Sequence, residues 1–232
     1  MSFIITEIGV NWDGDYELLE KMMQKAKNCS CDAVKFQAYS LDMIKNHPLK
    51  ERLAKSAVTE ENVERVDKIA KTVGIEWFCT PMYEEAVDFL DPYVKKFKIR
   101  EYDSRELIEN KRTKLFDKVF DTGKEIIIST NKSPKSCRFF KEPRIKWLYC
   151  IPKYPCELEF IDFSNLKDFN GYSNHHPHFI APLSAVILGA GIVEIHITSD
   201  KSKNFVDNNV SFDFKELENL MELIHKVEKI KR

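Results

Sequence analysis

The chain is poor in glycine, with only seven in 232 residues. None of the seven belongs to the GxGxxG pattern that brings a dinucleotide close to a helix N-terminus, which argues against a dinucleotide-binding fold. Net charge is almost absent as well, at a formal value of −1. A chain with so little excess charge gives no electrostatic reason to expect nucleic acid or a membrane surface as a partner. We therefore predict neither.

Long apolar runs and paired-cysteine motifs are also missing. No apolar run reaches the roughly 20 residues that a transmembrane helix needs, and the first five residues enter a strand-like pattern directly. The six cysteines show no zinc-type CxxC spacing. Cys79 and Cys150 lie in apolar runs typical of buried strands, so we predict buried free thiols. These features together predict a cytoplasmic protein.

The sequence does contain a regular alternation of strand-like and helix-like segments. Short apolar runs predict strands at residues 3–7, 33–37, 76–80, 96–100, 125–129, 145–150, 169–173 and 193–197. Apolar residues at helical spacing predict helices at residues 59–73, 83–90, 104–120, 181–188 and 214–230. Asp15 is expected to cap a further helix, and residues 40–58 are expected to form a functional loop with some helix.

This alternation defines the predicted fold. Strands that alternate with helices form a parallel sheet, and eight of them favour a (β/α)8 barrel over an open doubly wound sheet. The chain has 43% hydrophobic residues, enough for one substantial core, and no linker marks a second domain. We therefore predict one α/β domain, a TIM barrel covering residues 1–232.

Polar side chains are concentrated where the predicted strands end. In a barrel these carboxyl ends form the active face. The side chains predicted to gather there are Glu7, Lys35, Gln37, Thr80, Lys98, Glu101, Asp103, Ser129, Thr130, Tyr154, Ser173, His175 and His196. Two lysines and several hydroxyls suit an anionic substrate such as a phosphate or a carboxylate. Two histidines with a nearby acid suit a divalent metal that acts as a Lewis acid.

Each of these residue types also has a purely structural interpretation. A strand histidine such as His196 is often simply packed, and His176 and His178 are typical of solvated loop residues. Lysines inside strands are harder to explain in this way, because a lysine is seldom buried without a partner. Lys35 and Lys98 are therefore predicted anion ligands, whereas Glu101 could either pair with a lysine or take part in chemistry.

Eight short motifs, in order along nearly the whole chain, resemble the N-acetylneuraminate (sialic acid) synthase family. They are Thr6-Glu7-Ile8-Gly9-Val10-Asn11, Asp32-Ala33-Val34-Lys35-Phe36-Gln37, Thr80-Pro81, Phe97-Lys98-Ile99, Ile128-Ser129-Thr130, Tyr154-Pro155, Gly171-Tyr172-Ser173-Asn174-His175 and Glu194-Ile195-His196-Ile197-Thr198. The family's catalytic domain is a (β/α)8 barrel. It condenses phosphoenolpyruvate with the open-chain aldehyde of an N-acylated amino sugar, releases phosphate and forms a nonulosonic acid.

The resemblance implies roles for individual residues. His175 and His196 match the ligands of a divalent metal, usually manganese, with magnesium or cobalt as alternatives. The matches to substrate-binding positions are Lys35, Gln37, Thr80, Lys98, Asp103, Ser129 and Ser173. Glu7, Asp207 and Tyr154 match positions close to the metal and the acceptor sugar, and we predict them as catalytic residues. Because the family assembles as dimers, the resemblance also implies a homodimer.

Two departures from the family pattern leave other functions open. Glu101 stands where the family has a small serine beside the phosphate, so its charge should repel phosphate unless Lys98 or Arg100 compensates. The sequence also stops at Arg232, before the family's small C-terminal antifreeze-like domain. We therefore expect a synthase that works as one domain or with a separate antifreeze-like protein. The alternatives are a non-catalytic or regulatory relative and a related metal-assisted sugar carbon–carbon lyase or isomerase.

Overall fold

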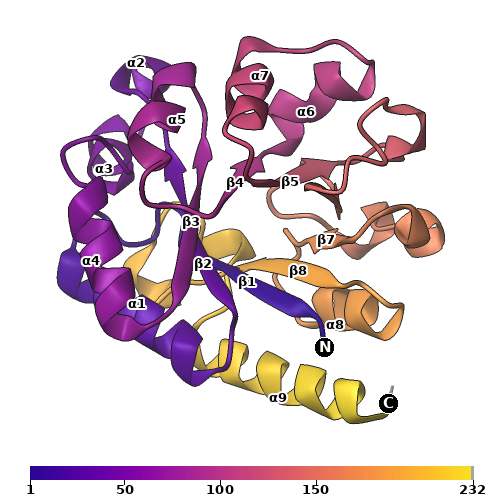
Figure 1. The fold of residues 1–232 in the computed structure, drawn as a ribbon. Coiled ribbons are helices and arrows are strands. Elements are labelled where there is room, and N and C mark those ends of the chain that lie inside the picture. The colour runs from indigo at the N-terminus through magenta and orange to yellow at the C-terminus, as the bar shows by residue number, and fades with distance from the viewer. Residues whose placement is uncertain (231–232) are drawn as a thin grey trace.

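Eight parallel strands form a closed barrel in the computed structural model, which describes residues 1–230 (Figure 1). The strands are β1 (Phe3–Glu7), β2 (Ala33–Ala38), β3 (Glu76–Pro81), β4 (Lys96–Ile99), β5 (Glu125–Thr130), β6 (Ile145–Cys150), β7 (Gly171–Ser173) and β8 (Ile192–His196). Each pairs with the next along the chain, and β8 pairs with β1, so the sheet has no open edge. The predicted TIM barrel is confirmed.

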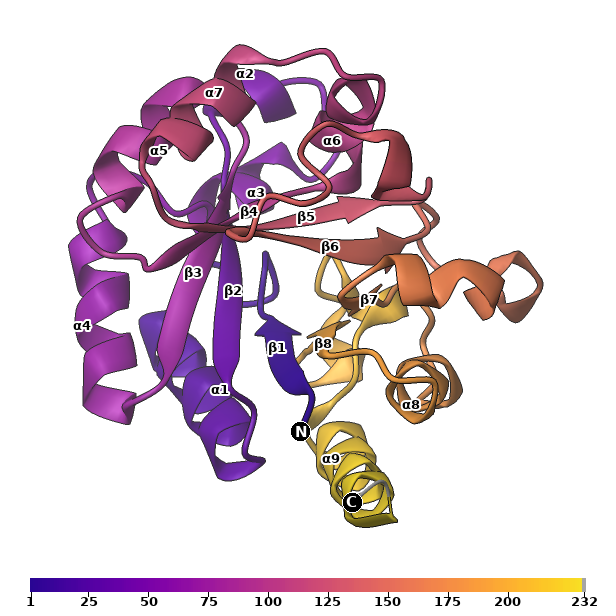
Figure 2. The same ribbon diagram turned by 45° about the vertical axis from the view of Figure 1, so that its right-hand side comes forward.

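Helices surround the barrel on its outer side (Figures 1 and 2). They are α1 (Tyr16–Asn28), α2 (Leu41–Ile44), α3 (Lys50–Ser56), α4 (Val63–Val73), α5 (Glu84–Leu90), α6 (Glu101–Ile108), α7 (Lys114–Asp121), α8 (Ile180–Ile187) and α9 (Phe214–Ile230). Asp15 caps α1 as predicted, because its Oδ1 accepts the N–H groups of Glu17 and Leu18 at 2.9 and 3.1 Å. Two of the helices, α2 and α3, lie in the predicted loop at residues 40–58.

One predicted helix is wrong. Residues 104–120 do not form a continuous helix but belong to α6 and α7, with a break between them. Asn110 has a φ of 63° and leaves the right-handed helical region. Thr113 then starts α7, and its hydroxyl accepts the N–H of Phe116 at 3.1 Å. The apolar spacing continues across the break, from Leu107 to Leu115, so periodicity alone did not reveal it.

The strand β2 shows how the barrel separates polar from apolar side chains. Successive side chains of a strand point to opposite faces of the sheet. Phe36 is fully buried and its ring packs edge-on against Trp77 of β3, at 6.1 Å between centroids. Lys35 and Gln37, on the other face of β2, line a cavity inside the barrel. The apolar core therefore lies mainly between strands and helices, and polar groups face the barrel's interior at the strand ends.

Close contact between two strands requires Gly171. This residue opens β7 and pairs with Ile192 of β8. A Cβ atom at position 171 would lie 1.8 Å from the carbonyl oxygen of Ile192, so no larger residue fits without moving the backbone. This contact holds β7 beside β8, and Ser173 is then paired directly with Glu194.

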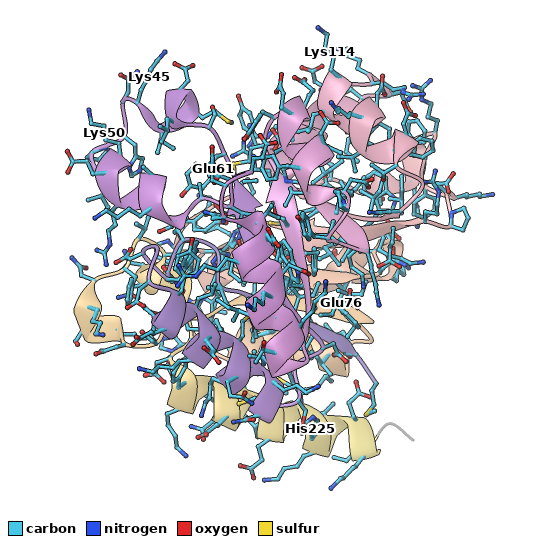
Figure 3. All side chains as sticks on the ribbon, turned by 60° about the vertical axis from the view of Figure 1, so that its left-hand side comes forward. Lys45, Lys50, Glu61, Glu76, Lys114 and His225 are labelled. Atoms are coloured by element: carbon cyan, nitrogen blue, oxygen red, sulfur yellow. The ribbon has the colours of Figure 1, made fainter. Side chains whose placement is uncertain are left out.

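The last helix, α9, lies near the opposite end of the barrel from α2 and α3. Figure 3 shows His225 of α9 at the bottom, whereas Lys45 and Lys50 project outward at the top. The start of the chain lies against the last described turns of α9, where the backbone N–H of Ser2 donates to Glu228 at 2.9 Å. All six cysteines are buried and free, as predicted. No helix among residues 1–230 is long and apolar enough to cross a membrane.

Candidate active site

A cavity of about 430 Å³ opens at the carboxyl ends of the strands and is lined by residues from all eight of them. It brings together most of the site residues predicted from sequence. These are Glu7, Lys35, Gln37, Thr80, Lys98, Ser129, Tyr154, Ser173, His175, His196 and Asp207. Figure 2 shows why residues distant in sequence meet here, because β1 lies between β2 and β8.

The ammonium group of Lys35 lies at the centre of one side of the cavity. Its Nζ is 2.7 Å from Oε2 of Glu7, the residue directly opposite it in the β1–β2 register. It also donates to the Thr80 hydroxyl at 3.2 Å. Gln37 donates through Nε2 to Oε1 of Glu7 at 2.8 Å. Burial disfavours the charged lysine, but Glu194 and Glu7 outweigh it and raise the pKa of Lys35.

Glu194 is a central residue that the sequence analysis did not single out. Its Oε2 is 2.8 Å from Nζ of Lys98, and its Oε1 is 3.7 Å from Nζ of Lys35. Ser173 donates its hydroxyl to Oε1 at 3.1 Å. Burial favours the neutral acid, but the charges of Lys35 and Lys98 outweigh it and lower the pKa of Glu194 to about 2. Its position two residues before His196 in β8 was the available signal, because both then face the barrel's interior.

The imidazole of His175 has a defined hydrogen-bonding pattern. Its Nδ1 lies 2.8 Å from the carbonyl oxygen of Ile151, which can only accept, so Nδ1 carries the proton. Nε2 is then an acceptor, and the Tyr154 hydroxyl donates to it at 2.6 Å. Burial and the nearby His196 lower the pKa of His175 to about 3, so the ring is neutral at physiological pH.

His196 lies beside His175, with 5.5 Å between the ring centroids. Its Nδ1 is buried, 3.5 Å from Oδ2 of Asp207, and forms no hydrogen bond within residues 1–230. Burial favours the neutral form of Asp207, but its interaction with His196 outweighs burial and lowers the pKa of this carboxyl group. The cavity therefore brings two imidazoles and the Asp207 carboxylate together.

No group of three or more histidines, cysteines, aspartates and glutamates in the described part of the chain has the arrangement of a complete metal site. The donor set of this chain is smaller, namely the Nε2 lone pair of His175 and the imidazole of His196. Imidazole nitrogens bind divalent first-row transition metals, whereas manganese and magnesium also favour carboxylate and water oxygens, which small molecules can supply at open positions. The residues present thus fit a metal ion that two protein nitrogens hold and that substrate or water oxygens complete.

Glu101 lines the cavity, and its charge is compensated by neither Lys98 nor Arg100, the two candidates named from the sequence. Its carboxylate is paired instead with Arg105, whose Nη2 lies 2.8 Å from Oε2. Arg100 is paired with Asp103, at 2.5 Å between Nε and Oδ2. Asp103 and Thr130 are the predicted active-face residues that do not line the cavity. The carboxylate of Asp103 is turned toward Arg100 instead.

His176 was expected to be a solvated loop residue, but this is wrong, because the structure buries it. Its Nδ1 lies 2.7 Å from the carbonyl oxygen of Cys156, and His176 as a whole is only 4% exposed. His178 is exposed, as expected for a loop residue. Neither lines the cavity, so the two metal candidates remain His175 and His196.

A closed barrel of parallel strands with a polar cavity at their carboxyl ends defines the class of (β/α)8-barrel enzymes. Comparison with known proteins identifies the group within that class. The chain is 33% identical to the uncharacterized protein MJ1065 of Methanocaldococcus jannaschii, over 97% of this chain and 72% of that protein. It is 29% identical to the pseudaminic acid synthase of Campylobacter jejuni, over 97% of this chain and 74% of the relative.

The fold gives the same result. The crystal structure of the N-acetylneuraminic acid (sialic acid) synthetase of Leptospira borgpetersenii in complex with citrate matches with a TM-score of 0.86 and 27% sequence identity. The match covers 99% of this chain and 85% of that one. Residues 22–232 match the NeuB family, and the chain belongs to this family. Its named relatives are synthases of sialic-type acids, so it is an enzyme.

Proposed function

We propose that the protein condenses phosphoenolpyruvate with the aldehyde of an N-acylated amino sugar to give a nonulosonic acid and free phosphate. One observation carries the proposal: two buried lysines, three hydroxyls and two imidazoles converge in a single cavity at the strand ends of a NeuB-family barrel. The overall reaction also consumes one water. Its balance is phosphoenolpyruvate, aldehyde and water on one side, and the acid and phosphate on the other.

The lysine side of the cavity would hold phosphoenolpyruvate. Lys35 and Lys98 supply charge, and the hydroxyls of Thr80, Ser129 and Ser173 supply hydrogen bonds. The Ser129 hydroxyl is buried and has no hydrogen-bond partner in the described residues. A buried hydroxyl without a partner is costly, so a ligand oxygen at this point would relieve the cost.

The histidine side would hold the metal and the acceptor sugar. When bound, a divalent ion, with manganese as our first choice, supplies Lewis-acid polarisation of the aldehyde oxygen. His175 and His196 would bind it through their imidazole nitrogens. For His175 to do so, the Tyr154 hydroxyl must leave Nε2, which it occupies at 2.6 Å. The phenol would then be free to donate to an oxygen of the acceptor sugar.

Proton transfer falls to the acids beside these ligands. Glu7 and Asp207 line the cavity on either side of His196, to which Glu7 is paired in the β1–β8 register. The water consumed must lose a proton when it adds to the carbon that bears the phosphate, and an ionised carboxylate at this place can accept it. Gln37 holds one oxygen of Glu7 and thereby fixes the direction of the other.

The arrangement of Glu101 weakens the argument for a non-catalytic relative. Of the two departures behind that argument, one was an uncompensated carboxylate beside the phosphate. The carboxylate is compensated, because Arg105 binds it through Nε at 3.1 and 3.2 Å and through Nη2 at 2.8 Å.

Phosphate release from phosphoenolpyruvate tests the proposal. Purified protein is assayed with manganese, with and without N-acetylmannosamine and related amino sugars, and sugar-dependent release is expected. Lys98→Met should abolish it. Lys96→Met is the matched control, since Lys96 is in the same strand but pairs with Glu76 and Glu125 outside the cavity. A folded, metal-loaded protein that releases no phosphate with any sugar would overturn the proposal.

A further inference from the structure

Two arginines line the outer part of the cavity, above the buried lysines. The side chains of Arg100 and Arg105 are 36% and 54% exposed, against 5% and 3% for Lys35 and Lys98. The exposed ring of Tyr102 lies between the two guanidinium groups, at 5.2 Å from each. The cavity thus has an inner pair of lysines and an outer pair of arginines.

Charges of opposite sign balance along the cavity wall. Four cations (Lys35, Lys98, Arg100 and Arg105) face four carboxylates (Glu7, Glu101, Glu194 and Asp207). Each of the four cations is already within ion-pair distance of an acid. An incoming phosphate therefore gains little from net charge, and its binding depends on cations that still have N–H groups to donate.

Arg105 is the cation of the cavity that is best suited to bind a phosphate. It donates to Glu101 through Nε and Nη2 only, so the N–H groups of Nη1 form no hydrogen bond within residues 1–230. Its partner Glu101 is 6% exposed and fixed in place as the first residue of α6. The carboxylate benefits there from the helix N-terminus and from a base four residues further on.

A hydrogen bond holds helix α6 next to Ser129 of the cavity. The hydroxyl of Ser104 donates to the carbonyl oxygen of Ser129 at 2.7 Å, so the first turn of α6 is fixed next to that residue. The unpartnered hydroxyl of Ser129 lies in the same cavity. Glu101 lines the same cavity as the Lys98–Glu194 pair.

We propose that Glu101 is a positioning residue that orients Arg105, and that Arg105 is a ligand for the phosphate group of the anionic substrate. A carboxylate that repels phosphate when alone becomes useful when it holds a guanidinium with N–H groups left to donate. The pair would replace the hydrogen bond that a small serine provides at this position. That the bound molecule is phosphoenolpyruvate rests on the proposed function. That Glu101 orients Arg105 to bind a phosphate group does not.

Calorimetric titration with inorganic phosphate and with phosphoenolpyruvate tests the pair. Arg105→Ala should weaken the binding of both by about 10- to 100-fold, the loss expected for a hydrogen bond to a charged group. The double variant Glu101→Ser with Arg105→Ala should bind more tightly than Arg105→Ala alone, because no unpaired acid remains. Glu101→Ser alone should bind more weakly than the wild type, because Arg105 loses its support.

A matched control exists on α4. Lys71 is an exposed base paired at 2.6 Å with the buried acid Asp67, four residues earlier, and neither lines the cavity. Lys71→Ala should leave both affinities unchanged. Wild-type affinity in Arg105→Ala would overturn the inference, as would tighter binding in Glu101→Ser alone or no binding of either ligand by the wild type.

The two proposals fail in different ways. Sugar-dependent phosphate release that persists in Arg105→Ala with an unchanged KM for phosphoenolpyruvate would leave the function standing and refute the pair. Binding of phosphate that depends on Arg105, in a protein that releases no phosphate with any sugar, would support the pair and refute the function.

Discussion

Glu194 of β8 lies 2.8 Å from Nζ of Lys98 in β4, and the side chains of both are at most 4% exposed. The same carboxylate is 3.7 Å from Nζ of Lys35, so one buried acid pairs with two buried lysines, and the three residues come from three different strands. A buried ion pair is expensive to desolvate, and its removal from one side leaves uncompensated charge. Glu194 therefore matters for stability as well as for the site.

Glu194→Gln should lower the free energy of unfolding by about 3–5 kcal/mol, because Lys35 and Lys98 would lose their shared counter-charge. Urea unfolding measures the change. Glu222→Gln is a suitable control, since Glu222 forms an exposed pair with Lys226 and should cost about 0.5 kcal/mol or less. Equal stabilities of the two variants would contradict the prediction.

The contribution of Glu194 should depend on pH. Its pKa falls from a usual 4.5 to about 2 on folding, so the unfolded chain binds the proton more tightly. The stabilisation is therefore complete above pH 4.5 and is lost as the pH falls toward 2. The stability difference between wild type and Glu194→Gln should therefore shrink as the pH falls from 4.5 to about 2. A difference that stays constant over this window would show that the pKa is not depressed.

Tyr154→Phe should bind manganese about two- to tenfold more tightly in the absence of substrate, because the phenol no longer competes for Nε2 of His175. Calorimetry with the metal alone gives the affinity. Tyr149→Phe serves as the control, since this tyrosine accepts only a long hydrogen bond from Asp162 and does not line the cavity. Weaker metal binding by Tyr154→Phe would mean that the phenol supports the metal instead.

Gly171→Ala should destabilise the fold by about 3 kcal/mol or more, because the new Cβ would meet the backbone of Ile192 rather than a movable side chain. Gly191→Ala is a milder change nearby, with its nearest contact 3.2 Å away at the carbonyl oxygen of Asn170. Thermal unfolding of the two variants makes the comparison. A Gly171→Ala protein as stable as Gly191→Ala would show that β7 and β8 can separate without cost.

The barrel was predictable because its strands are marked by short apolar runs that a parallel sheet buries on both faces. The helix break was not, because Leu107 and Leu115 keep the helical spacing that α6 and α7 each require. The turn residues Asn110 and Thr113 were the only local signal, and side-chain periodicity does not report backbone conformation.

The site residues that lie on strands were predictable from the sequence, whereas the residues at the outer part of the cavity were not. Strand register dictates where Lys35 and His196 point, so both could be assigned from the strand ends alone. Arg100 and Arg105 reach the cavity from a loop and a helix through long side chains, whose direction depends on partners that spacing does not reveal. The Arg105–Glu101 pair is such a case. The sequence alone suggested that Glu101 repels phosphate, whereas in the structure its charge is paired with Arg105.

The pairing of Glu7 with His196 joins the first and the last strand of the barrel, and both residues line the cavity. Asn11 reinforces this closure, since its side chain donates to the carbonyl oxygen of Ile197 at 2.9 Å. Of the eight strands, β1 leaves the ribosome first and β8 last, so β1 lacks one of its two partner strands until β8 is made. A growing chain that has not yet reached β8 therefore has no closed barrel around the cavity, and its early strands are exposed to wrong pairing until then.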